Sequence, residues 1–552
     1  MLIKAFFLFT CAIMYRHMKE FCNKHKRILI DIAILVGLFL FVTIAFLALK
    51  PFYFRPYEPE PYLNGTARLG VGSVDGIIPK VFVYICLFGV IIAGIILKIK
   101  NKLTIERLFF LIFLVGVLLQ LLYMLMTPIS YRQHDVNTDF NDGHDAYAWT
   151  LYSTGKLPTK VDADGHLAYQ FYHPPLNAFM QSTFMHVGKG LMSFTNFIAG
   201  RQLYDVTNQR AIFQTSEVLS TFYMNVAIYF GIKIAYKLKI ENKFKVFAAI
   251  FISFFPALII LAGQVNNDPL CIMNCFIVIY FTIKWWENHS YFNACMIGLF
   301  TGLAMFAKLS GALIIVPALV AFAIVLIQAI RKKETFKHYI FQGLIIGAIA
   351  APLGLWFHVY AKIRFDQPFG FVFSNLTDQL YKGNYNFFQR FINIFDFGDL
   401  FGNLWGNTFV NYNMPNFLIK SAIFGEYNFS GADALAGFAL VFNYLFVYLS
   451  LALMVIYFFK SGKEHLEIKI IAGTLIVSQL IAQLYFNIKM PYGCTMDFRY
   501  IVPIILGFMI LDALAMDKFA KENDWKKYFS IVTCFVEMSF IASSSLFYLA
   551  MF

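Results

Sequence analysis

Charged residues are scarce in this sequence. They make up 14% of the 552 residues, whereas a soluble domain typically carries about 25%. Hydrophobic residues make up 59% and aromatic residues 18%. This balance excludes a soluble globular domain and predicts a protein that crosses a membrane many times, with aromatic side chains at lipid-facing and interfacial positions.

Cysteine motifs are absent as well. The eight cysteines have neither the spacing of a zinc site nor that of a disulfide framework, and most of them lie inside apolar runs. The sequence also has no evident tandem repeat or low-complexity tract. We therefore expect one membrane-embedded unit.

Acidic residues are outnumbered by basic ones, which gives a formal net charge of +13. In a soluble protein such a charge would suggest a nucleic-acid partner. Here the lysines and arginines are concentrated in short connections between apolar segments, as the positive-inside rule predicts, and no basic-aromatic module is present. We expect membrane lipid around the chain and no nucleic-acid partner.

Long apolar runs, by contrast, are abundant. A helix needs about 20 apolar residues to span a bilayer, and roughly thirteen segments meet that requirement. The sequence thus predicts an all-α polytopic membrane protein. The segments lie near residues 28–49, 80–98, 107–127, 212–236, 245–263, 268–284, 292–307, 310–330, 338–359, 437–459, 468–488, 500–516 and 528–550.

The distribution of lysine orients these spans. All lysine-rich connections fall on one face if the first span runs from inside to outside. The opposite face, external or lumenal, then receives the two longest polar segments, 128–211 and 360–436. The lysine-rich connections are 98–102, 237–245, 331–337, 460–469 and 518–527.

We expect six regions along the chain. Residues 1–27 should form a cytosolic or interfacial leader, and 128–211 an external loop. In that loop, the run after Pro174-Pro175 has apolar residues at helical spacing, which predicts an amphipathic helix in the interface plane. The other regions are the N-terminal spans 28–127, the central spans 212–359, the second external region 360–436 and the C-terminal spans 437–552.

The external loop holds the main candidates for chemistry. Asp135 directly follows the span near 107–127, where a partly dehydrated carboxylate is placed to act as a general base for an acceptor hydroxyl. The alternative is an aspartate that only caps a helix end. The histidine-aspartate pair His134-Asp135 is followed by a second such pair, His144-Asp145. These four side chains could ligate a divalent metal ion.

Further polar residues lie on the same side of the membrane. Tyr172 and His173 precede the two prolines of the expected interfacial helix, so His173 could face the same site. Asn267 and Asp268 lie in a polar turn between two spans. Asp268 either caps the helix that begins there or contacts a substrate.

Two cations complete the predicted site. Lys308 interrupts an apolar stretch, so it should reach the interface, an acid or a bound phosphate. Arg499 lies at the external mouth of a span, and its guanidinium suits bidentate binding of phosphate oxygens. The alternative for Arg499 is an ion pair with Asp497. Together these residues predict one external site with a carboxylate base and cations for a phosphate.

With these motifs the chain resembles the GT-C superfamily of polyprenyl-phosphate-sugar-dependent glycosyltransferases. Within it, the chain is similar to the protein O-mannosyltransferase-like and lipid A aminoarabinose transferase-like enzymes. The resemblance implies a GT-C-like helix bundle with an external catalytic loop and interfacial helices, and it implies Asp135 as the catalytic base. It is carried by residues 132–135, 172–176, 266–270, 302–311, 424–427 and 497–500, so that Glu426 and Tyr500 join the candidate substrate contacts.

The expected function is inverting transfer of a sugar from a polyprenyl-phosphate-linked donor to a hydroxyl acceptor on a glycan, lipid or protein. Arg499, with Lys308 as a second cation, would stabilise the leaving phosphate, while His134, His173 and Tyr172 would orient the sugar or the acceptor. His144 and Asp145 are further candidate substrate contacts. The site would lie on the external side of a bacterial plasma membrane, or on the lumenal side of the endoplasmic reticulum membrane in a eukaryote. A secondary transporter or a flippase for lipid-linked sugars is the alternative. A polymerase or ligase that uses lipid-diphosphate oligosaccharides would share much of the topology.

Overall fold

The computed structural model describes residues 29–50, 74–129, 133–136, 139–372, 380–395, 412–426 and 433–551. The expected leader 1–27, Arg132 of the external loop and much of the second external region lie outside these residues.

Throughout the described residues the fold is helical, with three isolated β-bridges. This confirms the prediction of an all-α polytopic membrane protein. The first described helix is Leu29–Leu49. The long helices that follow are α2 (Val74–Ile99), α3 (Ile105–Met126), α5 (Leu176–Ala199), α7 (Ser216–Lys237), α10 (Asp268–Glu287), α13 (Lys337–Phe365), α15 (Asp433–Lys460), α16 (Leu466–Lys489) and α18 (Trp525–Ala550). The shorter ones are α4 (Gly143–Thr154), α6 (Gln209–Gln214), α8 (Asn242–Phe254), α9 (Pro256–Ala262), α11 (Tyr291–Ala307), η2 (Leu309–Ile314), α12 (Ile315–Arg331), η4 (Phe388–Ile392), α14 (Met414–Phe424), η5 (Gly493–Met496), η6 (Phe498–Tyr500) and α17 (Ile504–Phe519).

Eleven helical segments of the described chain are long and apolar enough to cross a membrane. Two further segments expected to span form the shorter helices α11, with 17 residues, and α17, with 16 residues. Both are cut short at the end that faces the candidate site: α11 stops at Ala307, before the extended residue Lys308, and α17 begins only after Pro503. These two helix ends therefore lie next to candidate site residues, Lys308 after α11 and Arg499 before α17.

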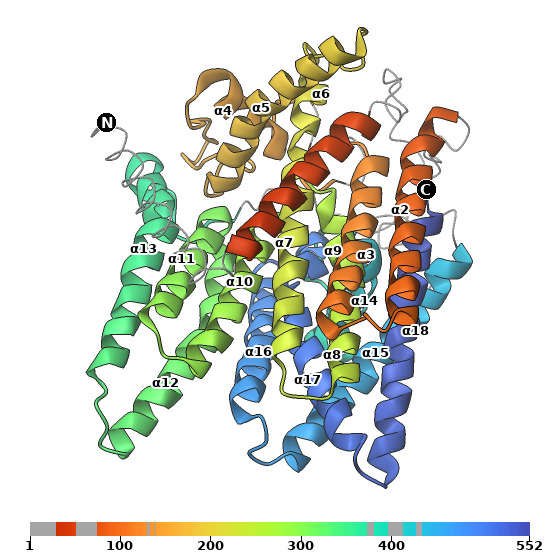
Figure 1. Ribbon diagram of the computed structural model, residues 1–552. Coiled ribbons are helices and arrows are strands. Elements are labelled where there is room, and N and C mark those ends of the chain that lie inside the picture. The colour runs from red at the N-terminus through yellow and green to blue at the C-terminus, as the bar shows by residue number, and fades with distance from the viewer. Residues whose placement is uncertain are drawn as a thin grey trace, which may run out of the picture.

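The helices lie roughly alongside one another, with α4, α5 and α6 gathered at one end of the bundle (Figure 1). The α12–α13 and α17–α18 connections lie at the opposite end. These connections contain the lysine-rich segments 331–337 and 518–527. The two kinds of connection thus occupy opposite ends of the molecule, while the assignment of one end to the cytosol stays a prediction.

The helix α5 begins at Leu176, directly after the two prolines, as the sequence predicted. Phe184 and Met185 are buried against the rest of the protein, whereas Phe194 and Phe197 are exposed. Exposed aromatic side chains on one side of a helix at this end of the bundle suit contact with the lipid interface. A position in the interface plane remains a prediction.

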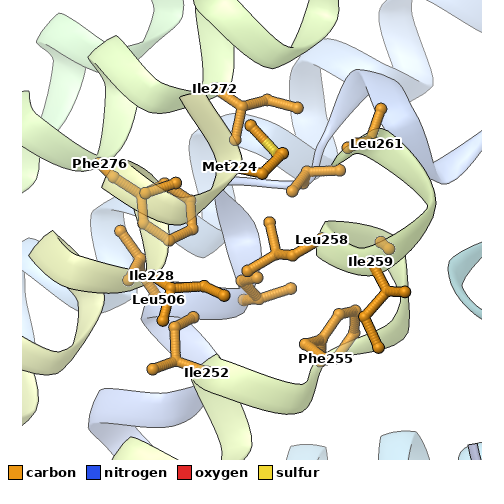
Figure 2. Close-up of a cluster of buried hydrophobic side chains, with 14 of the residues drawn as sticks. Met224, Ile228, Ile252, Phe255, Leu258, Ile259, Leu261, Ile272, Phe276 and Leu506 are labelled. Atoms are coloured by element: carbon orange, nitrogen blue, oxygen red, sulfur yellow. The ribbon is translucent and has the colours of Figure 1, made fainter. Parts of the chain in front are cut away.

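A close-packed apolar core supports the site. One predicted span, 245–263, is in fact two helices, because Pro256 cannot continue the backbone hydrogen bonds of α8 and holds Phe255 in an extended conformation. The short α9 then packs mainly against α3, α7 and α14, and this fixes the turn 263–267 at its end. Figure 2 shows this core, with Met224, Ile228, Ile252, Phe255, Leu258, Ile259, Leu261, Ile272, Phe276 and Leu506.

Candidate functional site

Helix ends and loops from distant parts of the chain meet at one point. Asp135 follows α3, Asp268 is the first residue of α10, and Lys308 follows α11. Arg499 lies in η6 and contacts the first two of these residues. Glu426, which follows α14, reaches the same place through His134. The structure therefore brings together residues that the sequence had placed only on the same side of the membrane.

Arg499 lies at the centre of the site. Its Nη1 atom is 3.4 Å from Asp135 Oδ2 and 3.6 Å from Asp268 Oδ2, and its Nε atom is 3.6 Å from Asp497 Oδ2. Asp497 also caps η6, since its Oδ1 atom accepts a hydrogen bond from the Arg499 backbone N–H at 3.0 Å. The side chain of Arg499 is only 8% exposed. The pair with Asp497 is thus present, but it is one of three contacts between Arg499 and carboxylates.

Asp135 is the most accessible acid of the site, with 27% of its side chain exposed. Its backbone has φ 58°, a left-handed conformation that costs a non-glycine residue roughly 1 kcal/mol. The Asp135 carbonyl accepts a hydrogen bond from the His144 N–H at 2.9 Å, and the Tyr169 hydroxyl donates to Asp135 Oδ1. These contacts fix the aspartate in a strained conformation, as is common for functional residues.

Opposing effects act on the pKa of Asp135. Burial raises it, but the Arg499 guanidinium, His144 and the hydrogen bond from Tyr169 together hold the pKa well below its usual value. Asp135 is therefore a carboxylate at neutral pH. It combines a negative charge, partial exposure and a neighbouring cation.

Lys308 reaches an acid, one of the three outcomes that the sequence predicted for it. Its Nζ atom is 2.5 Å from Asp268 Oδ1 and lies over the Tyr500 ring, 4.6 Å from the ring centroid. The close turn at this point needs a glycine, because a Cβ atom on Gly311 would lie 2.6 Å from the Ala304 carbonyl oxygen. Asp268 therefore forms ion pairs with Lys308 and Arg499, and the N-cap position of α10 is held by Asn267.

Tyr500 connects the two cations. Its hydroxyl accepts a hydrogen bond from Arg499 Nη2 at 3.1 Å, and its ring lies beneath the Lys308 ammonium. The guanidinium of Arg499 also lies 5.0 Å from the centroid of this ring. Cation–π contacts of this kind hold both positive groups in fixed positions.

His134 lies between two acids. Its Nδ1 atom is 3.2 Å from Glu426 Oε2, and its Nε2 atom is 3.5 Å from Asp497 Oδ2. Burial, together with the charge of Arg499, lowers the pKa of His134 to about 4, so the ring is neutral near pH 7. Burial raises the pKa of Glu426 to about 7, and burial together with Glu426 raises the pKa of Asp497 to about 6.

His144, Tyr172 and His173 form an aromatic group beside Asp135. The His144 and His173 rings are stacked at 5.9 Å, and Tyr172 lies 4.1 Å from His173 between ring centroids. Burial lowers the pKa of His144 to about 4 and the pKa of His173 well below its usual value, so both rings are neutral. The group offers flat faces and uncharged ring nitrogens close to the base candidate.

Asp145 and Asn267 occupy supporting positions. Asp145 is fully buried, and its Oδ2 atom accepts a hydrogen bond from the Phe140 N–H at 3.1 Å. Asn267 immediately precedes α10 and is also buried. The set of His134, Asp135, His144 and Asp145 expected for a metal ion is not the one that the fold assembles. Among the described residues, the buried group with ligand-like spacing is His134, Glu426 and Asp497.

Several residues that matter for this geometry were not expected from the sequence. Tyr169 binds Asp135 directly, although nothing in the loop sequence distinguishes it from other tyrosines. Gln133 donates a hydrogen bond to the Gly263 carbonyl at 2.6 Å, and Gln264 accepts one from the His134 N–H at 3.0 Å. Asn177 of α5 donates to the Asn266 carbonyl at 3.0 Å. These bonds join the external loop and α5 to the turn between α9 and α10.

The described structure therefore defines a class: a multi-pass membrane protein with an ionised polar site at one end of its helix bundle. A family model supports a narrower statement. The model of the family described as dolichyl-phosphate-mannose-protein mannosyltransferase matches residues 172–356. This match is consistent with a GT-C superfamily glycosyltransferase that uses a polyprenyl-phosphate sugar. It includes Tyr172, His173 and Lys308 of the site. Among curated proteins, none matches the chain.

Proposed function

We propose that this protein is an inverting glycosyltransferase that moves a sugar from a polyprenyl-phosphate donor to a hydroxyl acceptor at the external or lumenal face of the membrane. The observation that carries the proposal is the pairing of Asp135 with Arg499. A carboxylate that is partly exposed lies 3.4 Å from a buried guanidinium, although the two residues are 364 positions apart. The family match supports the class of donor.

The chemistry needs both members of that pair. Asp135 would take the proton of the acceptor hydroxyl as its oxygen attacks the anomeric carbon from the face opposite to the phosphate. The bond from the anomeric carbon to the phosphate oxygen then breaks, and polyprenyl phosphate leaves. A phosphate is a good leaving group, so it needs positive charge more than a proton, and Arg499 and Lys308 supply that charge.

Donor binding would also activate the base. Without a donor, Arg499 is shared among three carboxylates and holds Asp135 in its unprotonated, weakly basic form. A donor phosphate would compete for the guanidinium, which would weaken its effect on Asp135 and raise the proton affinity of that carboxylate. The base thus becomes stronger when a sugar is in place, which disfavours reaction in the absence of donor.

The aromatic group is the proposed contact for the sugar or the acceptor. Tyr172, His173 and His144 are next to Asp135 in the site, and neutral aromatic faces suit the apolar faces of a sugar ring. The acceptor class is a glycan, a lipid or a protein. The membrane is proposed to be a bacterial plasma membrane, or the endoplasmic reticulum in a eukaryote.

The test is sugar transfer from radiolabelled polyprenyl-phosphate sugars in membranes that contain the protein or a variant. Asp135→Asn should lower the rate by roughly 10²–10⁴-fold, because the general base is lost while the size of the side chain is kept. Asp139→Asn is the matched control, since this aspartate of the same loop is exposed and paired with Arg210 instead.

Two outcomes would redirect the proposal. If Asp135→Asn transfers sugar as fast as wild type, the role of Asp135 as general base is refuted. If wild type consumes none of the lipid-linked sugars, transfer itself is refuted, and transport assays with the same donors become the next experiment.

A further inference from the structure

The turn between α9 and α10 is joined to the external loop by two glutamines. Gln133 of the loop binds the turn with both ends of its amide: Nε2 donates to the Gly263 carbonyl at 2.6 Å, and Oε1 accepts from the Val265 N–H at 3.0 Å. In the other direction, Oε1 of Gln264 accepts a hydrogen bond from the His134 N–H at 3.0 Å. The side chains of Gln133 and Gln264, the glutamine pair, thus each bond to the backbone of the other's segment.

The glutamine pair connects the two segments that carry acids of the site. Asp135 follows Gln133 in the loop, and Asp268 follows Gln264 at the start of α10. Both acids contact the same atom of Arg499, since its Nη1 is 3.4 Å from Asp135 Oδ2 and 3.6 Å from Asp268 Oδ2. Two carboxylates repel one another, so their approach to one nitrogen atom depends on how the backbone holds them. The glutamine pair is a direct hydrogen-bonded link between these two stretches of backbone.

Helix α5 holds the same turn. Asn177 and Gln181 are buried on α5, about one helical turn apart, and their amides donate to backbone carbonyls of the turn at 3.0 Å and 2.5 Å. The turn also leads directly into α10, a helix of 20 residues. It is therefore held independently of Gln133, so loss of the Gln133 bonds would free the loop rather than the turn. The part of the loop that would then move carries Asp135.

The bonds of Gln133 require a donor and an acceptor on one side chain, because they reach a carbonyl and an N–H of the same turn. A glutamine amide supplies both, whereas a glutamate carboxylate only accepts and a methionine thioether accepts weakly. Two bonds fix the orientation of the loop as well as its distance from the turn. Asp135 needs such support, because its left-handed backbone, with φ 58°, persists only where the surrounding structure holds it.

We propose that Gln133 is a positioning residue for sugar transfer, which holds the carboxylate of Asp135 beside Arg499 by tying its segment to the turn that leads into α10. Gln133 acts through the general base and not on the donor phosphate, which stays with Arg499 and Lys308. This inference rests on the proposed function, because it assigns Gln133 to the base of that reaction. It predicts that loss of Gln133 slows the chemical step and leaves binding of the donor unchanged.

The test variant is Gln133→Met, which keeps the length of the side chain and removes both hydrogen bonds. Membranes are loaded with the radiolabelled polyprenyl-phosphate sugar that wild type consumes, and transfer is measured per bound donor, so that unfolded protein does not count. The rate constant should fall by roughly 10²-fold, the cost of a misplacement of about 1 Å, while the Kd of the donor stays the same. The matched control is Gln120→Met, since buried Gln120 also joins α3 to α9, through the Leu258 carbonyl at 3.0 Å, and should leave the rate constant unchanged.

A double variant shows whether Gln133 acts through Asp135. Once Asp135→Asn has removed the base, adding Gln133→Met should cause no further loss in the rate constant, because the two residues act as one unit. The positioning role is overturned if Gln133→Met alone transfers bound donor as fast as wild type, or if it slows the Asp135→Asn protein by the same factor as it slows wild type. Failure of the proposed function is a different result, in which wild type itself transfers no sugar and both proposals fall.

Discussion

The charge balance around Arg499 predicts that one damaging substitution is partly repaired by a second. Arg499→Gln removes the cation that lies 3.4–3.6 Å from Asp135, Asp268 and Asp497. Removal of one partner from a buried ion pair typically costs about 3–5 kcal/mol, because the remaining charge has lost its counter-charge. Arg499→Gln should therefore destabilise the protein strongly.

Adding Asp135→Asn to Arg499→Gln removes one of the carboxylate charges that have lost their counter-charge. We expect the double variant to be more stable than Arg499→Gln alone by about 1 kcal/mol or more, at the lower end of what an unpaired charge costs, because Asp135 is 27% exposed. Two mutations that each remove a site residue would then be less harmful together than Arg499→Gln by itself.

The assay is thermal unfolding of the detergent-purified variants, followed by tryptophan fluorescence at one heating rate. Combining Arg499→Gln with Asp139→Asn is the control, since Asp139 contacts Arg210 and should give no recovery. If Arg499→Gln/Asp135→Asn unfolds at the same or a lower temperature than Arg499→Gln, Arg499 does not serve as the counter-charge of Asp135 and the electrostatic account is refuted.

Three further outcomes are expected. Tyr169→Phe removes the hydrogen bond to Asp135 Oδ1 and should slow transfer by roughly 10-fold, the value of one hydrogen bond to a charged group; an unchanged initial rate would contradict an orienting role. Lys308→Gln leaves Asp268 to Arg499 alone and should raise the KM for the lipid-phosphate donor by about 10-fold, whereas an unchanged KM would remove Lys308 from phosphate binding. Gly311→Ala places a Cβ atom 2.6 Å from the Ala304 carbonyl and should cost about 1–3 kcal/mol of stability, whereas Gly343→Ala, with open space around it, should not; equal unfolding temperatures would show that the turn at Lys308 tolerates the methyl group.

The sequence was sufficient to predict that the candidate residues lie at one end of the bundle. Hydropathy predicted the helices, and the lysine-rich connections placed Asp135, Asp268 and Arg499 on the same side of the membrane. Connections on one side of the membrane lie at the same depth. Charged side chains in them are therefore close to one another and tend to form ion pairs. Lys308 was expected to reach the interface, an acid or a phosphate, and it pairs with Asp268. The pair of Arg499 with Asp497, the alternative to phosphate binding, is present as well.

The detailed contacts required the packing of the helices. His134 meets Glu426 only because α14 packs beside α9, and hydropathy carries no information about which spans are neighbours. Pro256 was visible in the sequence, but both sides of it are equally apolar, so the break between α8 and α9 was hidden within one predicted span. The hydrogen bond from Tyr169 depends on the path of an irregular loop, for which residue pattern gives no rule.

The order in which the charged residues of the site are synthesised has a consequence for membrane insertion. Asp268 and Lys308 are 40 residues apart, so an adjacent hairpin can neutralise Asp268 soon after it enters the membrane. Asp135 is 364 residues ahead of Arg499, a delay of about 20–70 s at ordinary rates of synthesis. During that interval the acid side of the site exists without its central cation. Chains truncated before Arg499 should therefore remain targets of membrane quality control, even when most of their spans are already inserted.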